Sequence, residues 1–166
     1  LIEQIADAYE ELDQVSDCRV IILKSEGKNF CAGANFGQDE DMLDKSVPYK
    51  KLYAQAVRLF KTKKPVIAVV QGAAIGGGLG LALSADFRIA CPEARFAANF
   101  AKLGFHPGFG SSVTLPRVIG TQKAMDMLFT ARRVGGEEAY DIGLADKLTS
   151  IENLMQIAKE FAEEIT

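Results

Sequence analysis

The sequence predicts an α/β fold, in which short buried strands alternate with helices. The run Pro65–Val70 is rich in β-branched residues and is bounded by turn-forming residues, which is typical of a strand covered on both faces. A similar run, Arg19–Lys24, precedes it, and helical spacing of apolar residues surrounds both. Alternation of this kind indicates an α/β architecture, and at 166 residues we expect a single domain over residues 1–166.

The first half of the chain is predicted to contain two amphipathic helices. Apolar residues recur at helical spacing from Ile2 to Leu12, which predicts a helix over residues 1–16 that leads into the first strand. The same spacing from Tyr49 to Phe60 predicts a second helix. Between them, Gln38–Asp41 is acidic and has no periodicity, so we interpret it as a surface loop.

Two loops of small residues follow the two predicted strands. Gly72–Gly78 leads from Val70 into a helix predicted over residues 79–84, and Gly27–Ala34 follows the earlier strand. Backbone N–H groups at a helix start have no acceptor within the helix. Two such loops at neighbouring strand ends can therefore share one anion.

The second half is predicted to continue the alternation and to end in a helix. Asp86–Ala90 and Arg95–Ala98 are expected to be short strands that flank a turn over residues 91–94. Ser111 and Ser112 are expected to cap the helix that follows them. Thr149, three residues before a glutamate, predicts a capping box in front of the final amphipathic helix.

Composition argues against several classes of protein. A net charge of -3 disfavours a dedicated nucleic-acid surface. Three cysteines without CxxC spacing and a single histidine suggest neither a disulfide framework nor a metal site. No apolar run approaches the length of a membrane span, and we expect a cytoplasmic protein with no membrane or nucleic-acid partner.

Three segments, taken in order, resemble the crotonase (enoyl-CoA hydratase/isomerase) superfamily. They are Phe30–Ala34, Gly72–Gly78 and Ser84–Ala90, and the resemblance continues through Leu115–Gly120 and Val134–Ala139. It implies a crotonase-like spiral of β-β-α turns. Against that family the chain begins within the first helix and stops before the closing helices, so we expect a fold truncated at both ends.

The resemblance also implies an acyl-CoA substrate and a set of site residues, with no permanently bound cofactor. The backbone amides of Ala34 and Gly77 would form an oxyanion hole, which stabilises negative charge on a thioester oxygen. Backbone around Lys28, Ala32 and Ala34 would hold the adenine of coenzyme A. The alternative for the glycines is that they only allow loop and helix to pack closely.

The chain departs from the family at both glutamates that hydratases use to add water. Those positions hold Gly80 and Phe100, and neither side chain can transfer a proton. His106 lies in the loop that lines the acyl pocket of relatives, and imidazole titrates near neutral pH. We hypothesise that His106 carries the proton, the alternative being a loop histidine bonded to backbone. Asn99, Tyr53 and Cys31 are weaker candidates.

Three functions remain open from the sequence. The first is an enzyme that stabilises a thioester enolate without hydration: an isomerase, a decarboxylase or a thioester hydrolase. The second is a hydratase that uses substitute groups, and the third is a binding or scaffold protein that keeps the fold without turnover. The family resemblance also leads us to expect a homo-oligomer, either a trimer or a hexamer.

Overall fold

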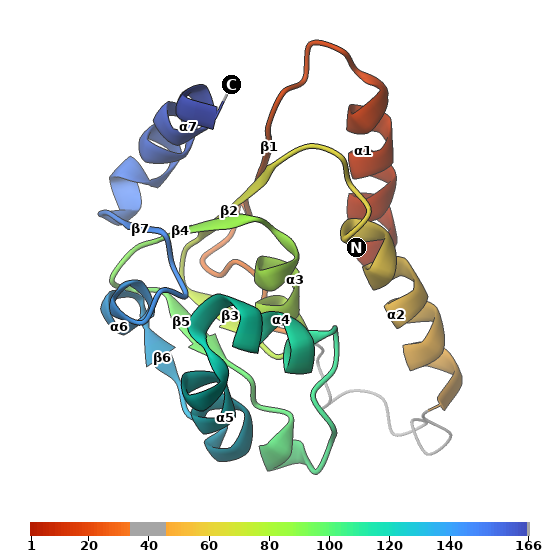
Figure 1. Ribbon diagram of the computed structural model, residues 1–166, viewed down its shortest axis with the longest axis vertical. Coiled ribbons are helices and arrows are strands. Elements are labelled where there is room, and N and C mark those ends of the chain that lie inside the picture. The colour runs from red at the N-terminus through yellow and green to blue at the C-terminus, as the bar shows by residue number, and fades with distance from the viewer. Residues whose placement is uncertain (34–45, 166) are drawn as a thin grey trace.

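The computed structural model describes residues 1–33 and 46–165, with the side chains of residues 46–50 left out (Figure 1). Its first half contains α1 (Ile2–Gln14), β1 (Ile21–Leu23), α2 (Ser46–Leu59), β2 (Val66–Val70), β3 (Ala73–Ile75) and α3 (Gly77–Ser84). The second half contains β4 (Phe87–Ala90), β5 (Arg95–Ala97), the 3-10 turn Ala101–Leu103, α4 (Ser111–Ile119), α5 (Thr121–Thr130), β6 (Val134–Gly135), α6 (Gly136–Asp141), β7 (Lys147–Leu148), the 3-10 turn Ile151–Asn153 and α7 (Leu154–Ile165). The predicted α/β class is confirmed.

The strands form two small sheets. One has the order β1-β2-β4-β7 and is parallel throughout, and the other has the order β3-β5-β6 with β6 antiparallel. All five residues of β2 are buried, which explains why its sequence is continuously apolar and does not alternate. Helix α7 packs against β2 and β4, with the rings of Phe87 and Phe161 in edge contact at 4.9 Å between centroids.

The segment predicted to lead directly into the helix contains an additional strand. Gly72 adopts φ 61 and turns the chain out of β2, and Ala73–Ile75 then forms β3 in the other sheet. A Cβ atom at Gly72 would lie 2.8 Å from Oδ1 of Asn29, so only glycine fits this turn. The prediction missed β3 because it is three residues long and enclosed by glycines.

Two capping predictions are wrong. Gly110 precedes α4, and the hydroxyl of Ser111 donates to the carbonyl of Gly108 at 2.7 Å instead of accepting from a helix N–H group. The final helix is preceded by a 3-10 turn that starts after Ser150, so Thr149 does not occupy the predicted cap. The strands on either side of residues 91–94 are confirmed, although they belong to different sheets.

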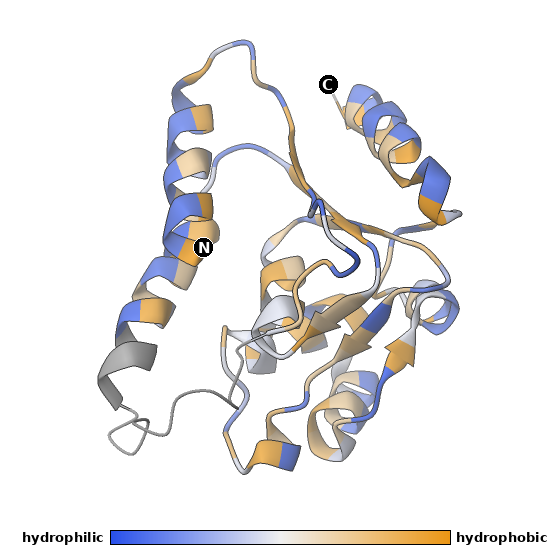
Figure 2. Cartoon of the chain, turned by 180° about the vertical axis from the view of Figure 1, so that it is seen from behind, coloured by the Kyte–Doolittle hydropathy of each residue, from blue (hydrophilic) through white to orange (hydrophobic). Residues whose placement is uncertain are grey.

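The helices place their polar sides outward. In Figure 2 hydrophilic residues gather on the side of α1 that faces away from the sheets. Its buried residues, Ala6 and Tyr9, belong to the same hydrophobic core as β2. This is the arrangement that the helical spacing of apolar residues predicts for a helix covering a core. The acidic loop predicted at Gln38–Asp41 lies outside the described residues.

Candidate active site

The start of α3 lies at the wall of a cavity. The N–H of Gly76 donates to the carbonyl of Ala97 at 2.8 Å, and the N–H of Gly80 donates to the carbonyl of Gly76 at 3.1 Å. Gly77 is the first residue of the helix, where an amide has no acceptor within the helix. It lines the cavity, and a Cβ atom there would meet nothing within 4 Å. Gly77 therefore combines a helix start with a position on the cavity wall.

The loop after β1 runs directly beside this helix start. The N–H of Phe30 donates to Gln71, that of Cys31 donates to Ala73, and the carbonyl of Cys31 accepts from Ile75 at 3.0 Å. Gly33, with φ 86, is so close that an added Cβ atom would lie 2.8 Å from the carbonyl oxygen of Ile75. The structure thus brings Ala32 and Gly33 to the cavity that Gly77 lines. Ala34 lies outside the described residues.

Polar side chains that the sequence analysis did not select hold the preceding part of this loop. The side-chain amide of Gln71, which is 9% exposed, donates to the carbonyls of Ser25 and Gly27 at 2.7 and 3.0 Å. The Oδ1 atom of Asn29 accepts from the N–H of Ala73. Lys28, which lies between Gly27 and Asn29 in the sequence, is exposed. The sequence does hold a signal for this role: Gln71 directly follows a wholly apolar strand, and a buried side-chain amide there needs hydrogen-bond partners.

The cavity has a volume of about 250 Å³ and mostly apolar walls. Helix α1 contributes Ile2, and α2 contributes Leu52 and Tyr53. The segment after β5 contributes Asn99 and Phe100. Among the described residues that line the cavity there is no acidic, basic or histidine side chain. The polar side chains that reach it are those of Cys31, Tyr53 and Asn99.

Aromatic rings occupy the space at both positions where hydratases of the family have a glutamate. Phe100 lines the cavity. Gly80 is buried in α3, and a Cβ atom there would lie 2.6 Å from Cγ of Phe109. The ring of Phe109, 4% exposed, therefore fills the volume into which a side chain at position 80 would project. The sequence indicated the missing carboxylates but not what takes their place.

His106 lies at the surface near the cavity-lining segment but does not line the cavity itself. Its Nδ1 atom is 3.0 Å from the carbonyl oxygen of Pro107. This contact is of the kind expected for a loop histidine bonded to backbone. A role of His106 in proton transfer stays a prediction, and it requires the imidazole to turn toward the bound acyl group.

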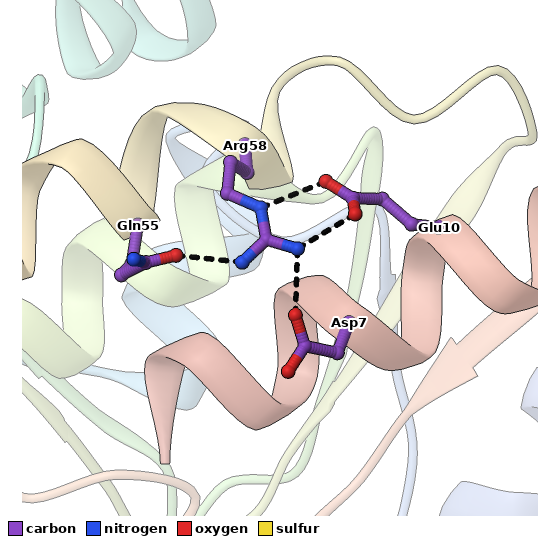
Figure 3. A network of polar contacts seen from close by, with 4 residues as sticks. All are labelled: Asp7, Glu10, Gln55 and Arg58. Carbon is purple, nitrogen blue, oxygen red and sulfur yellow. Dashed lines mark hydrogen bonds and ion pairs between the residues drawn. The ribbon is translucent and has the colours of Figure 1, made fainter.

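An arginine joins the two helices that form one wall of the cavity (Figure 3). The guanidinium of Arg58 on α2 donates to both oxygens of Glu10 at 2.7 and 2.6 Å, to Asp7 at 2.6 Å and to Gln55 at 2.6 Å. The hydrogen bond from Arg58 lowers the pKa of Glu10 below its ordinary value. Ile2 and Tyr53 lie on these same helices, so Arg58 connects the two helices that form this wall.

The described residues 1–33 and 46–165 contain no group of three His, Cys, Asp or Glu side chains that could hold a metal ion. Their helices are too short or too polar to cross a bilayer.

Comparison with known proteins gives consistent results. The sequence pattern of the family described as enoyl-CoA hydratase/isomerase matches residues 1–166. The short-chain-enoyl-CoA hydratase of Clostridium acetobutylicum is 37% identical over 172 residues, which cover 96% of this chain and 65% of that protein. The chain therefore spans somewhat less than two thirds of that relative.

Solved structures agree in fold. An enoyl-CoA hydratase from Bacillus anthracis superposes with a TM-score of 0.88 at 31% identity, covering 99% of this chain and 65% of the other. An enoyl-CoA hydratase/isomerase from Cupriavidus metallidurans superposes with a TM-score of 0.86 at 34% identity, covering 98% and 62%. The predicted crotonase fold is confirmed, and the chain covers somewhat less than two thirds of each of these structures.

Proposed function

The chain belongs to the enoyl-CoA hydratase/isomerase family, and on that premise we propose that it acts on an acyl-CoA thioester whose enolate it stabilises. The amides of Ala34 and Gly77 would form the oxyanion hole. Backbone around Lys28, Ala32 and Ala34 would hold the adenine of coenzyme A. The observation that supports the proposal is the position of Gly77, which begins α3 and lines the cavity together with Gly33.

The geometry supports this role for electrostatic reasons. A backbone amide is a fixed donor, and the positive end of the α3 dipole adds favourable potential for an oxyanion. Loss of one such donor typically raises a barrier by about 3 to 4 kcal/mol. The mostly apolar walls also lower the local dielectric constant, which strengthens the interaction between the amides and the developing charge.

The reaction would be isomerisation, decarboxylation or thioester hydrolysis and not ordinary hydration. Glutamates at positions 80 and 100 add water in hydratases of the family, and here those positions are Gly80 and Phe100. The ring of Phe109 fills the space above Gly80, which leaves no room for a carboxylate. His106 is our proposed proton carrier in place of these groups.

Exchange of substrate hydrogen for deuterium tests the enolate directly. The protein is incubated in heavy water with a panel of acyl-CoA thioesters, and uptake is read by mass spectrometry. His106→Ala is compared with Arg133→Ala, which changes an exposed residue elsewhere. Uptake lost only in His106→Ala supports the full proposal. Uptake that is unchanged in His106→Ala would contradict the role of His106 but would still support enolate formation.

Absence of uptake across the panel would contradict enolate formation. Release of free coenzyme A thiol would then indicate the hydrolase alternative, in which the oxyanion hole stabilises a tetrahedral intermediate and not an enolate. Tight binding without any turnover would indicate a binding or scaffold protein.

A second candidate is hydration by substitute groups, because relatives such as the Clostridium protein are named as hydratases. Loss of enoyl absorbance with a short 2-enoyl-CoA, at a rate comparable to that relative, would favour it. A rate at background would support the first candidate.

We also propose that the chain assembles as a trimer or a hexamer, as the family resemblance implies. Exposed apolar side chains on α5 support this: Phe129 is 72% exposed and Met125 is 40% exposed. Sedimentation of a folded monomer at micromolar concentration would contradict the proposal.

A further inference from the structure

We propose that Phe109 determines the acyl specificity of the cavity, restricting it to thioesters whose acyl group is apolar and uncharged. This inference rests on the proposed function, since it assumes that the cavity of Gly77 receives the acyl group. It goes further by naming the class of substrate and the residue that selects it. Among the proposed reactions it favours isomerisation or hydrolysis, because the substrate of a decarboxylase carries a carboxylate.

The backbone of Phe109 adopts a conformation that aromatic residues rarely tolerate. Its φ is 56, in the left-handed region, where a Cβ atom is crowded by the neighbouring peptide. The residue lies between Gly108 and Gly110, in a loop where glycine would be the usual choice for such an angle. A strained residue persists only where its surroundings hold it, and such residues concentrate at binding sites.

Gly80 and the ring of Phe109 hold one another in place. A Cβ atom at Gly80 would lie 2.6 Å from Cγ and 2.7 Å from Cδ1 of Phe109. The ring therefore packs directly on the backbone of α3, and only glycine at position 80 allows this contact. Because Gly80 lies one turn along from Gly77, Phe109 borders the cavity at the site where the thioester would bind.

The surroundings of Phe109 favour an uncharged acyl group. Phe100, Leu52 and Leu103 line the same cavity, and none of its described lining residues carries a charged side chain. An acyl group that ended in a carboxylate would be desolvated there without a cationic side chain from the described lining residues to pair with, which is costly. An aliphatic or aromatic acyl group would instead gain from leaving water.

The test is a binding comparison between two thioesters of equal length. Hexanoyl-CoA and adipoyl-CoA both carry six acyl carbons, but the second ends in a carboxylate, and free coenzyme A serves as the reference ligand. Affinities are measured by isothermal titration calorimetry. We expect hexanoyl-CoA to bind at least about tenfold more tightly than adipoyl-CoA, because the buried carboxylate finds no partner.

Phe109→Gly then identifies the residue responsible. Glycine accepts the left-handed backbone without strain, so this variant removes the ring while leaving the loop able to fold. We expect its preference for hexanoyl-CoA to fall by about tenfold, as water enters the space that the ring filled, with free coenzyme A bound as before. Tyr140→Ala, which removes an exposed ring on α6, is the matched control and should keep the preference.

The outcomes separate this inference from the function on which it rests. Equal affinity for both thioesters in the native chain would overturn the inference while leaving acyl-CoA binding intact. A preference unchanged in Phe109→Gly would overturn the assignment to Phe109. If neither thioester nor free coenzyme A bound, the proposed function itself would fail.

Discussion

Gly78 lies directly against the backbone of Cys31. A Cβ atom at Gly78 would come within 2.7 Å of the carbonyl carbon of Cys31 and 3.0 Å of its Cβ atom. That carbonyl also accepts from the N–H of Ile75, so it cannot move without breaking the contact between the loop and β3. The pair therefore sets how closely the loop after β1 approaches the start of α3, where the proposed oxyanion hole lies.

Gly78→Ala should damage both folding and the site. The added methyl forces the loop away from α3, and overpacking of this kind typically costs about 1 to 3 kcal/mol. Denaturant unfolding followed by circular dichroism measures the loss, and deuterium uptake reports the site. Gly135→Ala is the control, because a Cβ atom at Gly135 would meet nothing within 4 Å. Equal stability of the two variants would show that the loop yields easily.

Arg88 is expected to be the most costly charged residue to remove. It is 3% exposed, and it donates to the carbonyls of Leu144 and Ala85 at 2.7 and 2.8 Å as well as contacting Asp146. Burial lowers its pKa, while Asp146 acts in the opposite direction. Arg88→Met leaves these buried acceptors unpaired, and we expect a loss of about 3 kcal/mol.

The comparison variant for Arg88→Met is Arg132→Met. Arg132 pairs with Asp126 and Glu138 on the surface, where ion pairs contribute at most about 1 kcal/mol. Unfolding free energies from urea titration should differ accordingly. A larger effect at Arg132 than at Arg88 would contradict the structural role assigned to Arg88.

The wall formed by α1 and α2 should loosen at low pH. Arg58 lowers the pKa of Glu10 in the folded chain, so the folded state binds that proton more weakly than the unfolded state does. The stabilisation is therefore complete above the ordinary glutamate pKa of 4.5 and is lost as the pH falls through the lowered value.

Hydrogen exchange in α1 measures this loosening. Protection should fall between about pH 6 and about pH 3, values on either side of the ordinary glutamate pKa, after correction for intrinsic exchange rates. Arg58→Met should remove most of that difference. Lys24→Met, which removes the ion pair of Glu26 near the other end of the fold, should retain it. An equal pH response in Arg58→Met would contradict the assignment.

The sequence predicted those parts of the fold that depend on local pattern. Residues 66–70 were recognisable as a buried strand because both faces are covered, and the helix over residues 2–14 because one face is apolar. Strand β3 was not recognisable, because its three residues pair with Cys31 and with β5, which are distant in sequence.

The site shows the same division. The resemblance implied a site at Gly77 and no glutamate at positions 80 and 100, and the structure brings Gly77 and Phe100 to one cavity. That Phe109 fills the volume above Gly80 could not be inferred, because the two residues belong to different elements and their contact depends on a left-handed φ at Phe109. The exposure of His106 was equally hidden, since nothing in its local sequence states which way the loop faces.

A double-mutant cycle on Gly80 and Phe109 tests whether their contact is as close as the structure indicates. Gly80→Ala alone places a methyl against the ring and should destabilise the chain by about 1 to 3 kcal/mol. In Gly80→Ala/Phe109→Gly the methyl has room, because the ring is gone and position 109 keeps its left-handed backbone. The cost of Gly80→Ala should then largely vanish, since alanine is preferred to glycine within a helix.

Unfolding free energies of the four proteins give the coupling energy between positions 80 and 109 directly. Additive effects would mean that the ring of Phe109 can move away from Gly80. The part of the cavity wall that this ring forms would then be mobile as well.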